Sequence, residues 1–135
     1  AGPAMEMCAR SVILSAGLVS LMADDNYNCA LAHAVCYGLQ HFEHVERDDL
    51  HGDLVAYGAL VQLMLDGQTD KARELRAFLV SLGTPVTLAE MNVPLDKAAL
   101  HDALVEATTG PDMAHIPYPI TQDMVFEAMQ RVEAL

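Results

Sequence analysis

The segment Ala32-His33-Ala34-Val35-Cys36-Tyr37-Gly38-Leu39 is followed, after a polar stretch, by Leu50-His51-Gly52-Asp53. The first segment is apolar on all sides and rich in small side chains. This composition is typical of a helix that is buried on most faces and packs closely against its neighbours. His33 and His51 place ionisable groups within these apolar surroundings. We therefore expect any chemistry of this chain to lie here.

Outward from this segment, the apolar positions follow the three-and-four spacing of helices, and no stretch alternates like a strand. The charged stretch 43–49 breaks the pattern and is expected to be a loop or a frayed helix end. The sequence thus predicts an all-α bundle of about six helices with antiparallel neighbours. The expected helices are Met5–Met22, Cys29–Phe42, His51–Leu65, Lys71–Leu82, Lys97–Ala107 and a last helix from Thr121 to about Glu133.

Start and stop signals mark several of these helices. Gly83 followed by Pro85 predicts a sharp helix end. Thr87-Leu88-Ala89-Glu90 has the pattern of a capping box that opens one short turn. Polar residues suited to cap a helix N-terminus precede three helices: Asn26 or Asn28, then Asp96, then Thr121.

Length and composition limit the class of protein. A chain of 135 residues that is 53% hydrophobic is expected to form a single domain, 1–135, with a substantial core. Its net charge of −12, with seven Lys and Arg residues, argues against binding to nucleic acid or an anionic membrane. Three cysteines without paired spacing make a disulfide framework improbable and favour the cytoplasm. Val12–Met22 is apolar but lacks the basic start of a secretory signal and is too short to span a bilayer.

His33 has two interpretations from the residues alone. Burying an imidazole without a partner costs a few kcal/mol, so a core histidine bonded to a backbone carbonyl or to Tyr37 is the commoner case. The other is a divalent-metal site, because antiparallel helices would bring His33 face to face with His51. Two ligands hold a metal poorly, and the candidates for a third by residue type are Asp24, Asp25 and Asp53.

The remaining reactive side chains carry weaker signals. His41 and His44 are spaced for a metal pair but lie in a polar stretch that is expected to be solvated. His101 is expected at the surface, and His115 lies in a proline-rich loop from which it could reach a cleft. Cys36 points the same way as His33, and a buried thiol without a cationic neighbour is usually inert packing.

Four sequence segments, in order, resemble the glycerol dehydrogenase branch of the iron-containing alcohol dehydrogenase superfamily. They are 32–39, 50–63 with its His-Gly-acid-x-Val-Ala-aromatic-Gly motif, 82–89 and 110–121. The resemblance runs from about Cys8 to Leu135. It implies that the chain corresponds to the C-terminal helical domain of such a protein, incomplete at its start. The same helical scaffold occurs in dehydroquinate synthase-like and glycerol-1-phosphate dehydrogenase-like proteins, but no Lys or Arg adjoins the histidine pair.

In that family a nicotinamide cofactor, NAD, is bound by an N-terminal α/β domain that this chain does not contain. A metal, zinc in this branch, is held by an Asp and two His and polarises the substrate oxygen. Carried over by position, His33 and His51 match the two His ligands, and the Asp lies outside the chain. Cys36 and Tyr37 stand where the family commonly has His and Asn, and Asp53-Leu54 replace Glu-Lys.

The resemblance implies a truncated metal-binding domain of an NAD-dependent glycerol or polyol dehydrogenase-like oxidoreductase, inactive by itself. A small polyol would be a substrate only of a full-length parent. The alternative is a non-catalytic helical scaffold or oligomerisation module that has lost metal and cofactor. Either way, a bare surface that once covered a cofactor domain favours a homo-oligomer.

Overall fold

A computed structural model describes residues 2–22 and 29–135 of the protein. Within those ranges the regular structure is entirely helical, which confirms the all-α prediction. The helices are α1 (Pro3–Arg10), η1 (Ser11–Ala16), α2 (Gly17–Met22), α3 (Leu31–Leu39), α4 (Glu43–Asp48), α5 (His51–Leu65), α6 (Thr69–Leu82), α7 (His101–Thr109), η3 (Pro111–Met113) and α8 (Gln122–Glu133).

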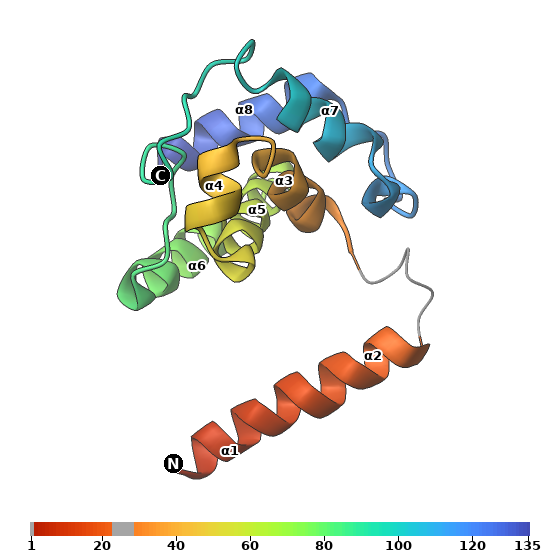
Figure 1. Ribbon diagram of the computed structural model, residues 1–135, viewed down its shortest axis with the longest axis vertical. Coiled ribbons are helices and arrows are strands. Elements are labelled where there is room, and N and C mark those ends of the chain that lie inside the picture. Colours follow the sequence, from red (N-terminus) through yellow and green to blue (C-terminus); the bar gives the residue numbers. More distant parts are fainter. Residues whose placement is uncertain (1, 23–28) are drawn as a thin grey trace.

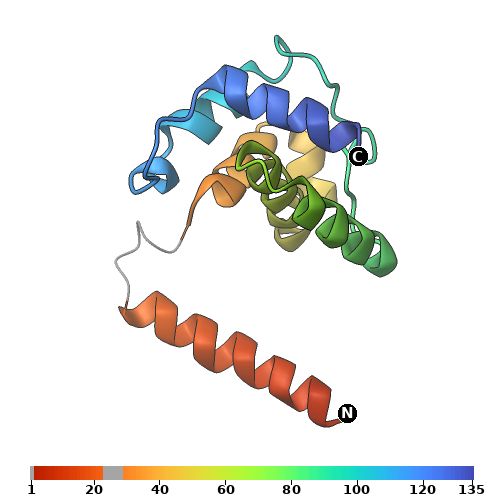
Figure 2. The same ribbon diagram turned by 180° about the vertical axis from the view of Figure 1, so that it is seen from behind.

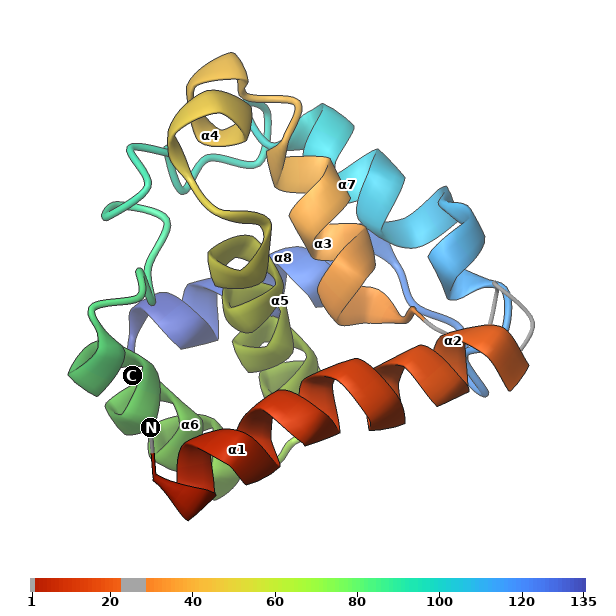
Figure 3. The same cartoon turned by 60° about the horizontal axis from the view of Figure 1, so that its bottom comes forward.

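Helix α3 occupies the centre, with α5 on one side and α7 on the other (Figure 3). Helix α8 packs against both α5 and α7, and α6 lies beside α5 (Figure 1). The central helices approach closely because glycine replaces a side chain at two contacts. A Cβ at Gly58 would lie 2.2 Å from the carbonyl oxygen of Ala32, and one at Gly38 would lie 2.5 Å from that of Ala103. These contacts fix how α5 and α7 sit against α3.

The structure confirms three of the helix-end signals. Gly83, at φ 77°, ends α6 in the left-handed conformation that glycine adopts without strain. At the capping box, the Glu90 N–H donates to Thr87 Oγ1 and Glu90 Oε2 accepts from the Thr87 N–H. Thr121 Oγ1 accepts from the Met124 N–H at the start of α8.

Two other cap predictions have different outcomes. Asp96 Oδ1 accepts from the Ala99 N–H, but the residues after it form turns and α7 begins only at His101. The prediction of a helix from Lys97 was therefore four residues early. Asn26 and Asn28 lie outside the described residues.

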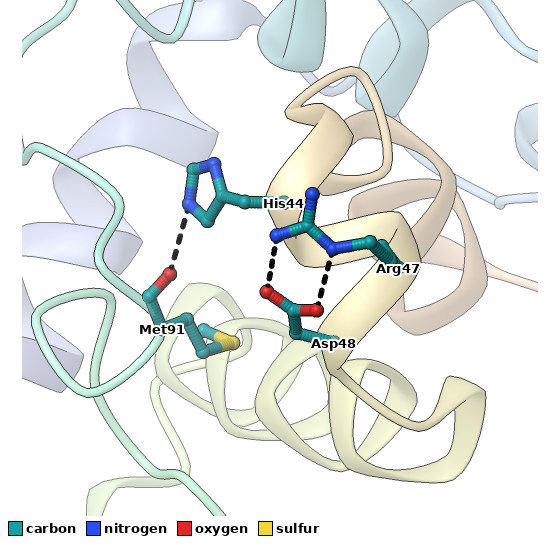
Figure 4. Close-up of polar contacts among 4 residues, drawn as sticks. All are labelled: His44, Arg47, Asp48 and Met91. Atoms are coloured by element: carbon teal, nitrogen blue, oxygen red, sulfur yellow. Dashed lines mark hydrogen bonds and ion pairs between the residues drawn. The ribbon is translucent and has the colours of Figure 1, made fainter.

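The prediction that 43–49 is a loop or a frayed end was wrong, because Glu43–Asp48 forms helix α4. Its one apolar side chain, Val45, is fully buried in the core. On the same helix, Nε2–H of His44 donates to the carbonyl oxygen of Met91 at 3.2 Å, while Arg47 and Asp48 pair with each other on the surface (Figure 4). One buried valine and one tertiary hydrogen bond thus hold a helix that lacks an apolar stripe.

The first helix forms as predicted, running from Pro3 to Met22, but its apolar face is not packed. None of its residues is buried, and large apolar side chains such as Ile13 (71% exposed) and Leu21 (85% exposed) face solvent. Figures 1 and 2 show this helix apart from the other helices in opposite views. The helical periodicity identified an apolar face correctly but not what covers it.

This helix is also longer than the apolar segment Val12–Met22. Its 20 residues, Pro3–Met22, are long and apolar enough to cross a membrane, which corrects the expectation that the segment is too short. The core helix of a soluble protein or a signal sequence meets the same criterion of length and composition. The criterion is therefore weak evidence for a membrane span.

Candidate functional site

Helices α3 and α5 bring His33 and His51 together. The two ring centroids are 5.8 Å apart and the rings are tilted by 46°. This confirms that the two histidines face each other across neighbouring helices. His33 is half-buried and His51 is exposed. His33 is thus not an enclosed core histidine, and both rings lie at the edge of the core within reach of solvent.

Tyr37 completes a triangle of rings with these histidines. Its centroid lies 6.3 Å from that of His33 and 6.0 Å from that of His51. Tyr37 follows His33 by one helical turn, so the two side chains point the same way along α3. His33 therefore meets Tyr37 through a ring contact. Burial is the main cause that raises the pKa of the Tyr37 hydroxyl, which favours its neutral form.

Cys36 contacts His51 and is fully buried. Its Sγ is 3.5 Å from Nδ1 of His51 and 3.9 Å from the carbonyl oxygen of His51. Burial raises the pKa of the Cys36 thiol to about 11, because the thiolate would lose its hydration. At neutral pH the group is therefore a protonated thiol and not a nucleophile.

The described residues supply no third ligand beside the pair. No group of three or more His, Cys, Asp and Glu side chains in ranges 2–22 and 29–135 is arranged to hold a metal ion. Asp53 is half-buried in the first turn of α5. Asp24 and Asp25 lie outside the described residues. The pair by itself can thus offer two imidazole nitrogens to a metal, short of the three protein ligands of a catalytic zinc site.

The other histidines lie elsewhere. His101 is exposed at the start of α7, as predicted. His41 is exposed as well, but His44 is half-buried and bonded to Met91, so the expectation of a wholly solvated stretch was wrong. His41 and His44 do not join a described cluster of three metal-binding groups.

His115 reaches a cleft, as its place in the proline-rich loop suggested. It lines a cavity of about 360 Å³ beside the start of α3. In the same wall, the Tyr118 hydroxyl donates to Asp66 Oδ1, and this hydrogen bond raises the pKa of Tyr118 to about 12. The sequence did not predict this contact, because Asp66 follows α5 and Tyr118 follows η3, far along the chain.

Comparison with known proteins gives a consistent set of relatives. No protein-family model matches the sequence. Hydroxycarboxylate dehydrogenase A of Escherichia coli is 34% identical over 126 residues, which is 92% of this chain and 34% of the relative. Glycolaldehyde reductase of Halobacterium salinarum is 32% identical over 124 residues, which is 88% of this chain and 33% of the relative. A glycerol dehydrogenase of Citrobacter freundii is 32% identical over 107 residues, which is 77% of this chain and 29% of the relative. The chain thus spans about a third of the length of these relatives.

Proposed function

We propose that the chain is the metal-binding helical part of an oxidoreductase of the iron-containing alcohol dehydrogenase type. It is homologous to dehydrogenases of this type over about a third of their length. The observation that supports this proposal is the facing pair His33 and His51. Two packed helices hold the centroids of their rings 5.8 Å apart. The relatives are named for a hydroxycarboxylate, glycolaldehyde and glycerol. Each of these names contains a small hydroxylated compound. We therefore propose a small polyol or hydroxy compound as the substrate class of the parent protein.

The donor set suits zinc in part. Neutral imidazole is a common zinc ligand, and the two rings come from rigid helices. His33 and His51 would supply two ligands, and a third would come from residues outside those that the structure describes. When bound in an open site, such a metal polarises an oxygen atom of the substrate. The work of the chain's own residues is to hold and orient the two rings.

The nicotinamide cofactor would be held by another part of the parent protein. The described residues contain no strand, and so no strand–glycine–helix phosphate site of the kind that binds dinucleotides. We therefore propose that NAD reaches this site only in a protein with a separate cofactor domain. The 135 residues alone should not catalyse dehydrogenation. Incubation with NAD, glycerol and zinc should give no NADH absorbance, and a clear rate would contradict the proposal.

Zinc binding tests the central part of the proposal. Isothermal calorimetry should show zinc binding to the metal-free chain. His33→Ala removes a ligand and should lower the affinity by more than about tenfold, since loss of even an outer contact of a ligand costs about 10- to 100-fold. The matched control is His101→Ala, which removes an exposed histidine from α7 and should leave the affinity unchanged. Binding that is indifferent to His33→Ala, or no binding at all, would favour a scaffold without metal chemistry.

The exposed helix Pro3–Met22 supports a second candidate function, self-association. Its apolar side chains are solvent-exposed along its length, with Met5 at 64%, Val12 at 66% and Met22 at 84%. A contiguous apolar surface of this kind is typical of an interaction site. We propose that a second copy of the chain covers it, so that the protein forms a homo-oligomer.

The three free cysteines accord with a cytoplasmic location, which we also propose.

A further inference from the structure

Among the described residues, Cys36 is the hydrogen-bond partner of the His51 ring. Its Sγ lies 3.5 Å from Nδ1 of His51 and 3.9 Å from the His51 carbonyl oxygen. Cys36 is fully buried on α3, whereas His51 opens α5 at the surface. The sulfur thus reaches the ring from the core side and engages one of its two nitrogens.

Counting protons indicates which nitrogen of His51 carries the hydrogen. A thiol has one proton, and a neutral imidazole has one ring proton. If the thiol donated to Nδ1, its contact with the carbonyl oxygen would be left without a proton. If the thiol donates to the carbonyl oxygen, its lone pairs face Nδ1, and Nδ1–H donates to the sulfur. Only this second arrangement makes both contacts hydrogen bonds.

We propose that Cys36 is a positioning residue that holds neutral His51 in the Nδ1–H tautomer and leaves the lone pair of Nε2 free. Which ring nitrogen is protonated is set by the hydrogen bond that the other nitrogen makes. Metal-binding histidines usually donate their second N–H to a carboxylate, a carbonyl or water. Here a buried sulfur takes that place. The consequence for metal binding rests on the function proposed above, but the tautomer itself does not.

Nitrogen NMR on the full chain, treated with a chelator to remove metal, tests the tautomer. With ¹⁵N-labelled histidine, long-range ¹H–¹⁵N spectra at a pH where the ring is neutral distinguish protonated from unprotonated ring nitrogens. Wild-type His51 should show a protonated Nδ1 and an unprotonated Nε2. The exposed His101 serves as the internal reference for a ring in solvent.

Two variants separate hydrogen bonding from packing. Cys36→Ala removes the acceptor, and His51 should shift toward the tautomer mixture of His101. Cys36→Ser keeps a donor and an acceptor at the same position and should retain the Nδ1–H tautomer. Circular dichroism checks that both variants fold. A wild-type His51 with its proton on Nε2, or a tautomer that Cys36→Ala does not change or that Cys36→Ser also loses, would overturn the proposal.

A metal titration then links the tautomer to the site. Loss of such an outer contact typically costs about 10- to 100-fold in metal affinity, and a weak sulfur acceptor should lie near the lower end. Cys36→Ala should therefore weaken zinc binding about tenfold, while Cys36→Ser should not. If no variant and no wild-type protein binds zinc, the proposed metal function fails while the NMR result still decides the role of Cys36.

Discussion

A Cβ atom at Gly58 would lie 2.2 Å from the carbonyl oxygen of Ala32. This contact joins α5 to α3 at the residue that precedes His33. It lets the two helix backbones touch, and so helps to set the spacing at which His33 and His51 meet. The geometry of the candidate site therefore depends on a residue that carries no chemistry.

Gly58→Ala should destabilise the protein, because the added methyl group meets backbone atoms that cannot move independently. Overpacking of this kind costs about 1–3 kcal/mol. The free energy of unfolding, measured by denaturant titration, should fall by about that amount. The histidine ring resonances should also change, because α5 must shift relative to α3.

Gly52→Ala is the matched control within α5. A Cβ at Gly52 has no neighbour within 4 Å, so the change should add only helix propensity, up to about 1 kcal/mol. Equal effects of the two substitutions on stability would contradict the close approach of α5 and α3.

Glu133 should make stability depend on pH in one direction. Burial raises the pKa of its carboxyl, although hydrogen bonds from the Leu88 N–H and the Tyr57 hydroxyl oppose this shift. The folded state therefore holds the proton more tightly than the unfolded chain. The stabilisation is fully present below the unfolded pKa of Glu133 and is lost as pH rises through its folded pKa. Relative to Glu133→Gln, the wild-type melting temperature should fall as pH increases across this range.

Glu90 should affect the pH dependence of stability in the direction opposite to Glu133. Its pKa is lowered, chiefly because the Val86 N–H donates to the carboxylate, with further donation from Thr87. Its contribution is present above the unfolded pKa and is lost as pH falls through the folded pKa. Glu90→Gln removes the charge but keeps an oxygen that can accept both N–H bonds. At neutral pH it should therefore cost less than a lost cap, which is worth about 1 kcal/mol, and less still in acid. Glu127→Gln, on the exposed face of α8, controls for the change in net charge; a similar pH profile for both variants would count against the capping role.

The exposed helix Pro3–Met22 should drive self-association. Light scattering should give a mass above the 14.6 kDa of one chain. The double substitution Leu14→Gln and Leu18→Gln removes two exposed apolar side chains and should shift the mass toward the monomer. Ser15→Gln on the same helix should not. A clean monomer for the wild-type chain would refute the assembly proposal.

Local signals in the sequence predicted much of the fold. The end of α6 at Gly83, the Thr87–Glu90 capping box and the start of α8 at Thr121 each depend on residues close together in the chain. Such contacts can be predicted from spacing alone. Helix α4 was missed because its stability comes from distant contacts, namely the burial of Val45 and the hydrogen bond from His44 to Met91.

The candidate site was predictable to the level of its helices. Periodicity and the expected antiparallel arrangement of the two helices indicated that His33 and His51 would face each other, as they do. The contact of Cys36 with His51 was not predictable, because it depends on the rotation of one helix against the other. The Tyr118–Asp66 hydrogen bond was missed for the same reason.

The most direct test of the account is the zinc stoichiometry and affinity of four chains: wild type, His33→Ala, His51→Ala and the double variant. If the two rings share one metal, the wild type should bind one zinc per chain. Either single substitution should then remove most of the affinity, and the double variant should lose little more. If the double variant binds zinc as tightly as the wild type, there is no metal site between α3 and α5.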